Sequence, residues 1–142
     1  MTILDAYALV AFLNGEPAAG EVAELIRSGD TAITPINLCE TLYITERQHG
    51  VSQLRQRAVI EPLLADRIAL LEHRYEHVWH AAQLRTRYFD RKLRALSFAD
   101  CLLLAAAAPG DRVASSDPPV AMVARSEGVT FLPLPDTNGA RP

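Results

Sequence analysis

Four acidic residues lie in parts of the sequence where acids are scarce and nearby cations are few. They are Asp5 in TILDAYALVAFL, Glu40 in TPINLCETLYIT, Asp100 in LSFADCLLLAAAA and Asp117 in RVASSDPP. A carboxylate in an apolar surrounding must find a partner or give up its charge. If the fold brings these four side chains together, a divalent metal ion is the partner that we expect.

The energy of such a cluster indicates which chemistry it would serve. Two unit charges about 4 Å apart repel by roughly 4 kcal/mol at an effective dielectric of about 20, and a bound cation reverses the sign. Oxygen ligands without His or Cys favour Mg²⁺ or Mn²⁺, which keep several waters and bind substrate phosphates. Such an ion can orient and activate a water molecule. The pattern therefore indicates hydrolysis of phosphodiester bonds.

Three of the acids also have a simpler explanation as helix caps. Asp100 has the spacing of a capping box with Ser97, whereas Asp5 and Asp117 each directly precede an expected helix. Glu40 lies within an expected helix and has no capping role. Because capping and metal binding are compatible, both explanations stay open for the other three.

The spacing of apolar residues predicts short strands that alternate with longer helices. Strands separated by helices favour a parallel sheet that is covered on both faces. We therefore expect one three-layer α/β/α domain with a central parallel five-stranded sheet over residues 1–134, followed by a loose Pro/Gly-rich tail at 135–142. The expected strands are 2–4, 31–34, 67–71, 112–115 and 129–132, and the expected helices are 6–13, 18–27, 36–49, 51–64, 75–88, 97–107 and 118–127.

This topology decides which acids can meet. In an open α/β sheet the functional crevice lies outside the carboxyl ends of the strands. Asp5 and Asp117 directly follow strands, and Glu40 and Asp100 lie in early turns of helices that can point at the same edge. The acids that precede strands lie at the opposite edge, about 15 Å away at roughly 3.3 Å per residue: Asp30, Asp66 and Asp111.

The order and spacing of the four acids over nearly the whole chain resemble the PIN-domain family, and more narrowly its VapC-type toxins of bacterial toxin–antitoxin pairs. The resemblance implies an endoribonuclease that depends on Mg²⁺ or Mn²⁺ and that forms a homodimer. It also implies a cognate antitoxin as protein partner and RNA as substrate.

The resemblance further assigns roles to residues of this chain. Asp5, Glu40, Asp100 and Asp117 match the family's acidic positions and would be the catalytic and metal-binding residues. Ser115 matches a Ser/Thr position and would orient the Asp117 carboxylate.

Two rival interpretations remain. In the first, the PIN-like fold is a non-catalytic module that binds RNA or protein. In the second, the chain is a receiver domain, which likewise holds acids and Mg²⁺ at a sheet edge. Receiver domains carry paired acids after the first strand and a late lysine, whereas here Asp5 stands alone and Lys92 is the single lysine.

A net charge of −3 argues against a surface that binds nucleic acid everywhere, but it allows a local basic groove. One basic segment interleaves cations with aromatic rings, and this mixture could hold phosphates and stack bases. A solvated basic helix face is an equally good explanation. The candidate RNA-binding residues are Arg85, Arg87, Arg91 and Lys92, with Arg94 in the same segment and Arg47 beyond Glu40.

The remaining candidates carry weaker signals. Cys39 and Cys101 are expected to be small buried thiols without a disulfide. Tyr75 and Trp79 are expected to be packing groups. No apolar run reaches the length of a membrane span and no leader precedes the first strand, so the expected location is the cytoplasm.

Three histidines have helical spacings that could form a zinc-binding face. The more economical explanation is that they are surface residues, because no HExxH arrangement is present. They are His73, His77 and His80.

Overall fold

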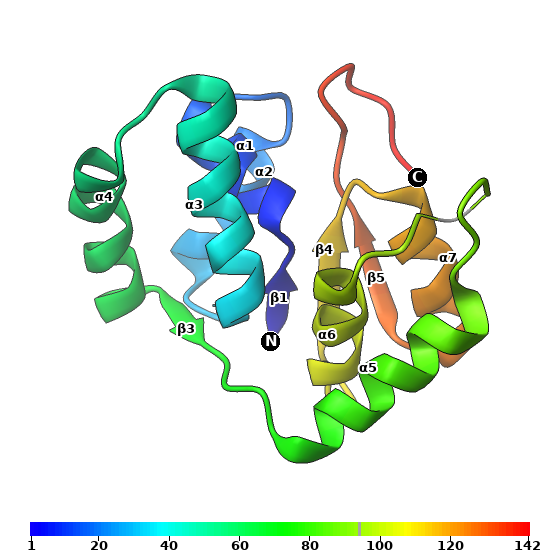
Figure 1. The fold of residues 1–142 in the computed structure, drawn as a ribbon. Helices are drawn as coiled ribbons and strands as arrows, with labels where there is room; N and C mark the ends of the chain where they lie inside the picture. The colour runs from blue at the N-terminus through cyan, green and yellow to red at the C-terminus, as the bar shows by residue number, and fades with distance from the viewer. Residues whose placement is uncertain (94) are drawn as a thin grey trace.

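Five short strands form one parallel sheet in the order β3-β2-β1-β4-β5 (Figure 1), as seen in a computed structural model that describes residues 1–93 and 95–142. The central strand β1 pairs with β2 on one side and β4 on the other, and every pair is parallel. The strands are β1 (Thr2–Leu4), β2 (Thr31–Ile33), β3 (Ile68–Leu70), β4 (Arg112–Ser115) and β5 (Thr130–Pro133).

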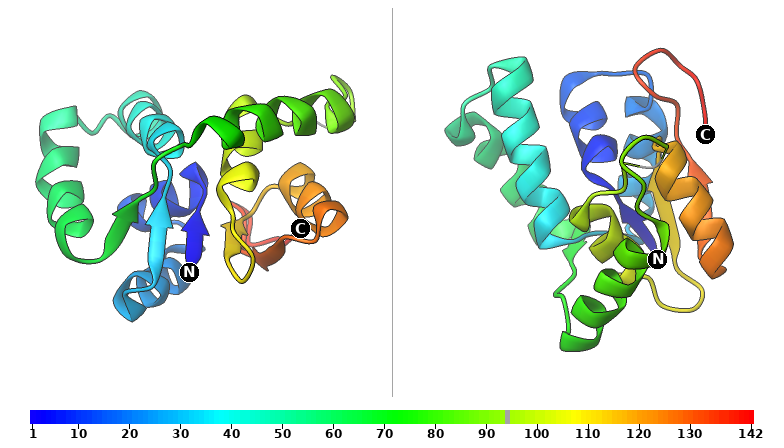
Figure 2. Two further views of the ribbon diagram at one scale, coloured as in Figure 1. Left: turned by 90° about the horizontal axis from the view of Figure 1, so that it is seen from below. Right: turned by 45° about the vertical axis from the view of Figure 1, so that its right-hand side comes forward.

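Helices connect the strands and cover the sheet (Figures 1 and 2). They are α1 (Ala6–Asn14), α2 (Ala19–Ser28), α3 (Pro35–His49), α4 (Gln53–Asp66), α5 (Tyr75–Tyr88), α6 (Phe98–Ala106) and α7 (Pro118–Glu127). Among the described residues, no helix is long and apolar enough to span a membrane.

The alternation of side chains along the strands produces a core on each face of the sheet. Successive strand residues point to opposite faces. Ile3 and Val113 belong to a buried cluster with residues of α5, α6 and α7. Their neighbours Leu4 and Ala114 belong to a second cluster with residues of α1 and α2. The predicted three-layer α/β/α fold with five parallel strands is confirmed.

Local signals explain the boundaries of the helix that carries Glu40. Thr34 caps α3 by accepting a hydrogen bond from the Asn37 N–H at 3.3 Å, and Pro35 takes the first turn, where no N–H is needed. Gly50 ends the helix with a φ of 67°, a left-handed conformation that favours glycine. The helix begins one residue earlier than predicted because proline is accommodated in the first turn.

Two expectations about buried side chains are wrong. Cys101 is buried, but Cys39 is exposed, because the buried face of α3 is a polar stripe that includes Thr41 and excludes Cys39. Tyr75 and Trp79 are 71% and 59% exposed and lie edge to face with ring centroids 6.2 Å apart. Helix α5 instead buries its small and branched residues, such as Ala81 and Leu84.

The C-terminal segment that the sequence predicts to be loose makes specific contacts. The Asp136 carboxylate accepts the Ala140 N–H at 2.9 Å, which organises a turn. Arg141 forms an ion pair with Glu21 on α2 at 2.6 Å and also donates to the Pro133 carbonyl. These contacts hold the segment beside the N-terminal helices.

Candidate active site

Asp5 stands at the centre of the carboxyl edge of the sheet, because it directly follows the central strand β1. Its carboxylate accepts a hydrogen bond from the Ala8 N–H at 2.7 Å and so caps α1. The residue is only 6% exposed. A capping role is therefore real for Asp5, but one backbone donor does not compensate for the burial of a full charge.

Asp117 follows the neighbouring strand β4 and occupies the N-cap position of α7. Its carboxylate makes no capping hydrogen bond, so the simple capping explanation does not hold for this side chain. Its backbone N–H donates to the Ser115 hydroxyl at 3.0 Å, and Ser115 is fully buried. The carboxylate of Asp117 thus lies at the sheet edge without the usual helical partner.

Asp100 reaches the same edge from the first turn of α6. The predicted capping box is present: the Ser97 N–H donates to Asp100 Oδ2 at 2.7 Å, and the Asp100 N–H donates to Ser97 Oγ at 3.0 Å. Both bonds fix the position of the carboxylate relative to the helix. Glu40 approaches from α3, which contacts α6, and its carboxyl is half-buried.

The pKa values of three of these carboxyls are raised, each in part by the charge of Asp100. Burial raises the pKa of Asp5 to about 7, and the charges of Asp100 and Asp117 add to the rise, while hydrogen bonds from Ser115 and Ala8 oppose it. Burial and the charge of Asp100 raise the pKa of Asp117 to about 6. The same two causes raise the pKa of Glu40.

Asp100 is the common neighbour in this cluster, since its charge acts on the other three carboxyls. Within the described part of the chain, no ion pair includes any of these acids, and no cation contributes to the pKa shifts of Asp5, Glu40 or Asp117. That the four acids form one site stays a prediction, and this coupling to Asp100 supports it. We refer to these four side chains as the carboxylate cluster.

The donor set of the carboxylate cluster suits a hard divalent cation, because it consists of carboxylate oxygens without a counter-charge of its own. However, over residues 1–93 and 95–142 no three metal-binding side chains are close enough to form a complete metal site. Mg²⁺ does not require one, since it is usually held by one or two carboxylates together with waters and substrate phosphates. Asp5 and Asp117 are the candidate ligands nearest the sheet edge.

Two of the candidate RNA-binding residues already have partners within the protein. Arg87 pairs with Glu127 at 2.7 Å, and Arg85 donates to the Leu96 carbonyl, so both guanidinium groups already have protein partners. The other candidates are exposed: Arg47, Arg91 and Lys92. Arg94 lies outside the described residues.

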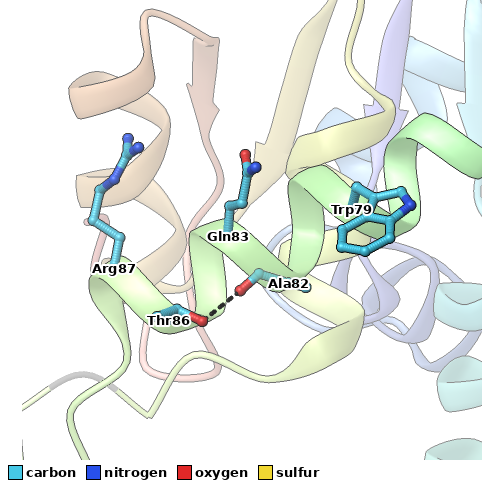
Figure 3. A pocket seen from close by; sticks show the side chains of 5 residues that line it. All are labelled: Trp79, Ala82, Gln83, Thr86 and Arg87. Carbon is cyan, nitrogen blue, oxygen red and sulfur yellow. Dashed lines mark hydrogen bonds between the residues drawn. The ribbon is translucent and has the colours of Figure 1, made fainter.

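A surface hollow of about 550 Å³ lies along α5 and does not include the acids. Trp79, Ala82, Gln83, Thr86 and Arg87 line it (Figure 3). Its lining is mainly apolar and comes from one helix. It is therefore a groove on the outer surface of α5 and not part of the carboxylate cluster.

The three histidines do not form a zinc site in the described part of the chain. His77 is buried, and burial together with the Arg74 charge lowers its pKa. Its ring contacts that of His73 edge to face, with centroids 6.3 Å apart. The pair is a packing feature between β3 and α5.

Phe98 is a large apolar residue that lies two residues before Asp100 and is 61% exposed. An exposed aromatic residue beside a capping box is a signal that the sequence contains, but its exposure depends on the rotation of α6 and is visible only in the structure.

The arrangement defines a class of protein: a parallel α/β fold with acids just after β1 and β4 and further acids on α3 and α6. The chain belongs to the PIN domain family, whose profile matches residues 2–118, and the resemblance predicted from sequence is confirmed. Among curated proteins, none matches the sequence significantly.

Similar solved structures include toxin–antitoxin complexes and a ribonuclease toxin. DNA-bound VapBC from Salmonella typhimurium superposes with a TM-score of 0.64 at 22% identity, covering 92% of this chain and 96% of that one. FitAcB from Neisseria gonorrhoeae gives 0.63 at 20% identity, with 93% and 96% covered. VapC20 of Mycobacterium tuberculosis, a toxin that cleaves the sarcin-ricin loop, gives 0.59 at 18% identity, with 91% and 85% covered. These similarities establish a common fold.

Proposed function

We propose that this chain is a metal-dependent endoribonuclease and acts as the toxin of a toxin–antitoxin pair. The observation that carries the proposal is the position of Asp5 and Asp117 just after the neighbouring parallel strands β1 and β4, with Asp100 near enough for its charge to raise the pKa of Asp5, Glu40 and Asp117. Placing carboxyls from four separate segments near one another without a cation costs free energy. Such costly placements are concentrated at functional sites. Membership of the PIN domain family supports the same reading.

The cofactor in this proposal is Mg²⁺ or Mn²⁺. Asp5 and Asp117 would hold the ion, and the carboxylates of Asp100 and Glu40 would complete the negatively charged site around it. When bound, the ion supplies a water of lowered pKa and neutralises charge on the phosphate. Asp5 is fixed for this role by the Ala8 N–H, and Asp100 by the Ser97 N–H. Ser115 positions the loop that carries Asp117 through the 3.0 Å bond to its backbone.

The proposed partners are an RNA substrate, a cognate antitoxin and a second copy of the chain. VapBC and FitAcB are complexes of related folds, and this supports an antitoxin partner here. Neutralising the acidic edge with a basic segment of the antitoxin would prevent RNA cleavage. We place the protein in the cytoplasm, where its RNA substrates are found.

Purified protein incubated with structured RNA tests the proposal directly. We expect cleavage with Mn²⁺ or Mg²⁺, loss of cleavage with EDTA, and loss in Asp5→Asn. Asp66→Asn is the matched control, because this exposed acid precedes β3 at the opposite edge of the sheet and should leave cleavage unchanged. If RNA binds but remains intact with either metal, the chain is a binding module instead.

A further inference from the structure

Helix α3 buries a stripe of polar residues where an apolar stripe is usual. The helix packs alongside α1 (Figure 1), and its buried positions recur every four residues, which places them on one face. They are Asn37, Thr41 and Thr45, each at most 1% exposed. Burying a hydroxyl or an amide costs free energy unless a hydrogen bond compensates for it. Stability alone would favour apolar side chains here, so the contacts of each polar group indicate its role.

Thr41 connects α3 to the part of the chain beside Asp5. Its side chain is fully buried, and its hydroxyl lies 3.2 Å from the Ala6 carbonyl oxygen of α1 and 2.9 Å from the Asn37 carbonyl oxygen of its own helix. A hydroxyl has a single proton, which these two acceptors share. Thr41 directly follows Glu40 in the sequence, as Ala6 follows the first acid. One hydrogen bond thus joins the chain neighbours of two acids from different segments.

The fold fixes the surroundings of this contact. The Asp5 N–H donates to the Ala114 carbonyl of the neighbouring strand β4 at 3.1 Å, so the start of α1 is tied to the sheet. At the far end of α3, the His49 ring lies 3.4 Å from the Glu16 carboxylate in the connection between α1 and α2. Because α3 is held at both places, loss of the Thr41 bond would free the part of the helix that carries the acid and leave its far end in place.

We infer that Thr41 is a positioning residue for the nuclease reaction and that its hydrogen bond to Ala6 sets the place of Glu40 relative to the start of α1. This inference rests on the proposed function, in which Glu40 and Asp5 belong to one metal site. A carboxylate on a helix moves when the helix shifts or rotates, and a displacement of about 1 Å can cost on the order of 100-fold in rate. Because Thr41 is fully buried, it acts through the helix that it holds and not by contact with RNA.

Thr45 provides a matched comparison within the same stripe. It lies one helical turn beyond Thr41 and is 1% exposed, but over residues 1–93 and 95–142 its hydroxyl has no hydrogen-bond partner. Replacing Thr45 by valine keeps the shape of the side chain and removes no hydrogen bond. The two threonines therefore differ in their contact with α1 and not in their burial.

Three variants test the inference: Thr41→Val, Thr41→Ser and Thr45→Val. We would measure kcat and KM for cleavage of structured RNA at saturating Mn²⁺, and Mn²⁺ affinity by calorimetry without RNA, well below the melting temperature of each variant. Thr41→Val keeps the side-chain volume but lacks the hydroxyl. We therefore expect its kcat and its Mn²⁺ affinity each to fall on the order of 10-fold, with KM for RNA unchanged.

The other two variants separate positioning from packing. Thr41→Ser keeps the hydroxyl and should retain the wild-type kcat and Mn²⁺ affinity, although the lost methyl group lowers its melting temperature. Thr45→Val should match the wild type in both measurements. Equal losses in Thr41→Ser and Thr41→Val, or losses that follow the melting temperatures, would overturn the inference because they would assign Thr41 to packing.

The outcomes also distinguish this inference from the proposed function. Wild-type kcat and Mn²⁺ affinity in Thr41→Val would overturn the inference alone, because cleavage by the wild type would still support a nuclease. If the wild type binds Mn²⁺ but cleaves no RNA, the proposed function fails, and a loss of Mn²⁺ affinity confined to Thr41→Val would support the positioning role. If the wild type neither binds Mn²⁺ nor cleaves RNA, both proposals fail.

Discussion

The buried hydroxyl of Ser115 hydrogen-bonds the carboxyl of Asp5 across the neighbouring strands β4 and β1, and this contact keeps the pKa of Asp5 from rising further. The same oxygen accepts the backbone N–H of Asp117 at 3.0 Å. One side chain thus connects two acids from different strands. Its position at the end of β4 makes it a positioning residue for both.

Ser115→Ala should therefore impair cleavage without unfolding the protein. We expect a loss on the order of 10- to 100-fold, the usual effect of removing a group that orients a metal ligand. Because one of the bonds that lower the Asp5 pKa disappears, the pH at which activity appears should move upward. The pH profile of cleavage measures this shift, and Ser126→Ala, an exposed serine on α7, is the control. A proportional loss at every pH would argue against the contact with Asp5.

Asp5→Asn should abolish cleavage while the fold persists. The amide oxygen can still accept the Ala8 N–H, so α1 keeps its cap. Above about pH 7 the variant should be at least as resistant to thermal unfolding as the wild type, because it removes a buried negative charge. RNA gels and melting curves recorded side by side test both parts. Full cleavage by this variant would refute the catalytic assignment.

The capping box allows the structural and chemical roles of α6 to be separated. Ser97→Ala removes the hydroxyl that accepts the Asp100 N–H and should cost about 1 kcal/mol of unfolding free energy. Its cleavage at a temperature well below unfolding should remain within a few-fold of the wild type. Asp100→Asn should show the opposite behaviour, with a small change in stability and a large loss of cleavage. If both variants lose activity in proportion to stability, Asp100 is only a cap.

The fold was predictable because its signals are local. Thr34, Pro35 and Gly50 mark both ends of α3 in the sequence, and the alternation of strands and helices leaves a parallel sheet as the natural topology. The placement of Asp5 and Asp117 followed from the same topology, since residues after parallel strands share one edge. These inferences need only nearest neighbours along the chain and the handedness of crossover connections.

Side-chain environments were harder to predict because they depend on how each helix is rotated against its neighbours. In α3 the face that packs on α1 is polar, with the Thr41 hydroxyl donating to the Ala6 carbonyl at 3.2 Å, so Cys39 was wrongly expected to be buried. In α5 the small residue Ala81 faces the core, and Trp79 is left outside. The hydrophobicity of a residue alone does not predict which face of a helix packs against the core.

The raised pKa values of Asp5 and Asp117 predict that metal-induced stabilisation depends on pH. Both carboxyls bind a proton more tightly in the folded protein than in the unfolded chain. The pKa is about 7 for Asp5 and about 6 for Asp117 in the folded protein, against 3.8 for an unperturbed Asp. Their contribution to stability is therefore fully present below about pH 4 and is lost as the pH rises toward 7.

A divalent ion that binds the ionised cluster reverses this loss. Added Mg²⁺ or Mn²⁺ should raise the melting temperature little at about pH 5 and clearly at about pH 8, and binding near pH 6.5 should release protons into the buffer. Calorimetry in buffers of different ionisation enthalpy measures the protons released. NaCl at matched ionic strength separates screening from binding, and Asp5→Asn should reduce the proton release. An equal rise in melting temperature at both pH values would show that the ion binds elsewhere.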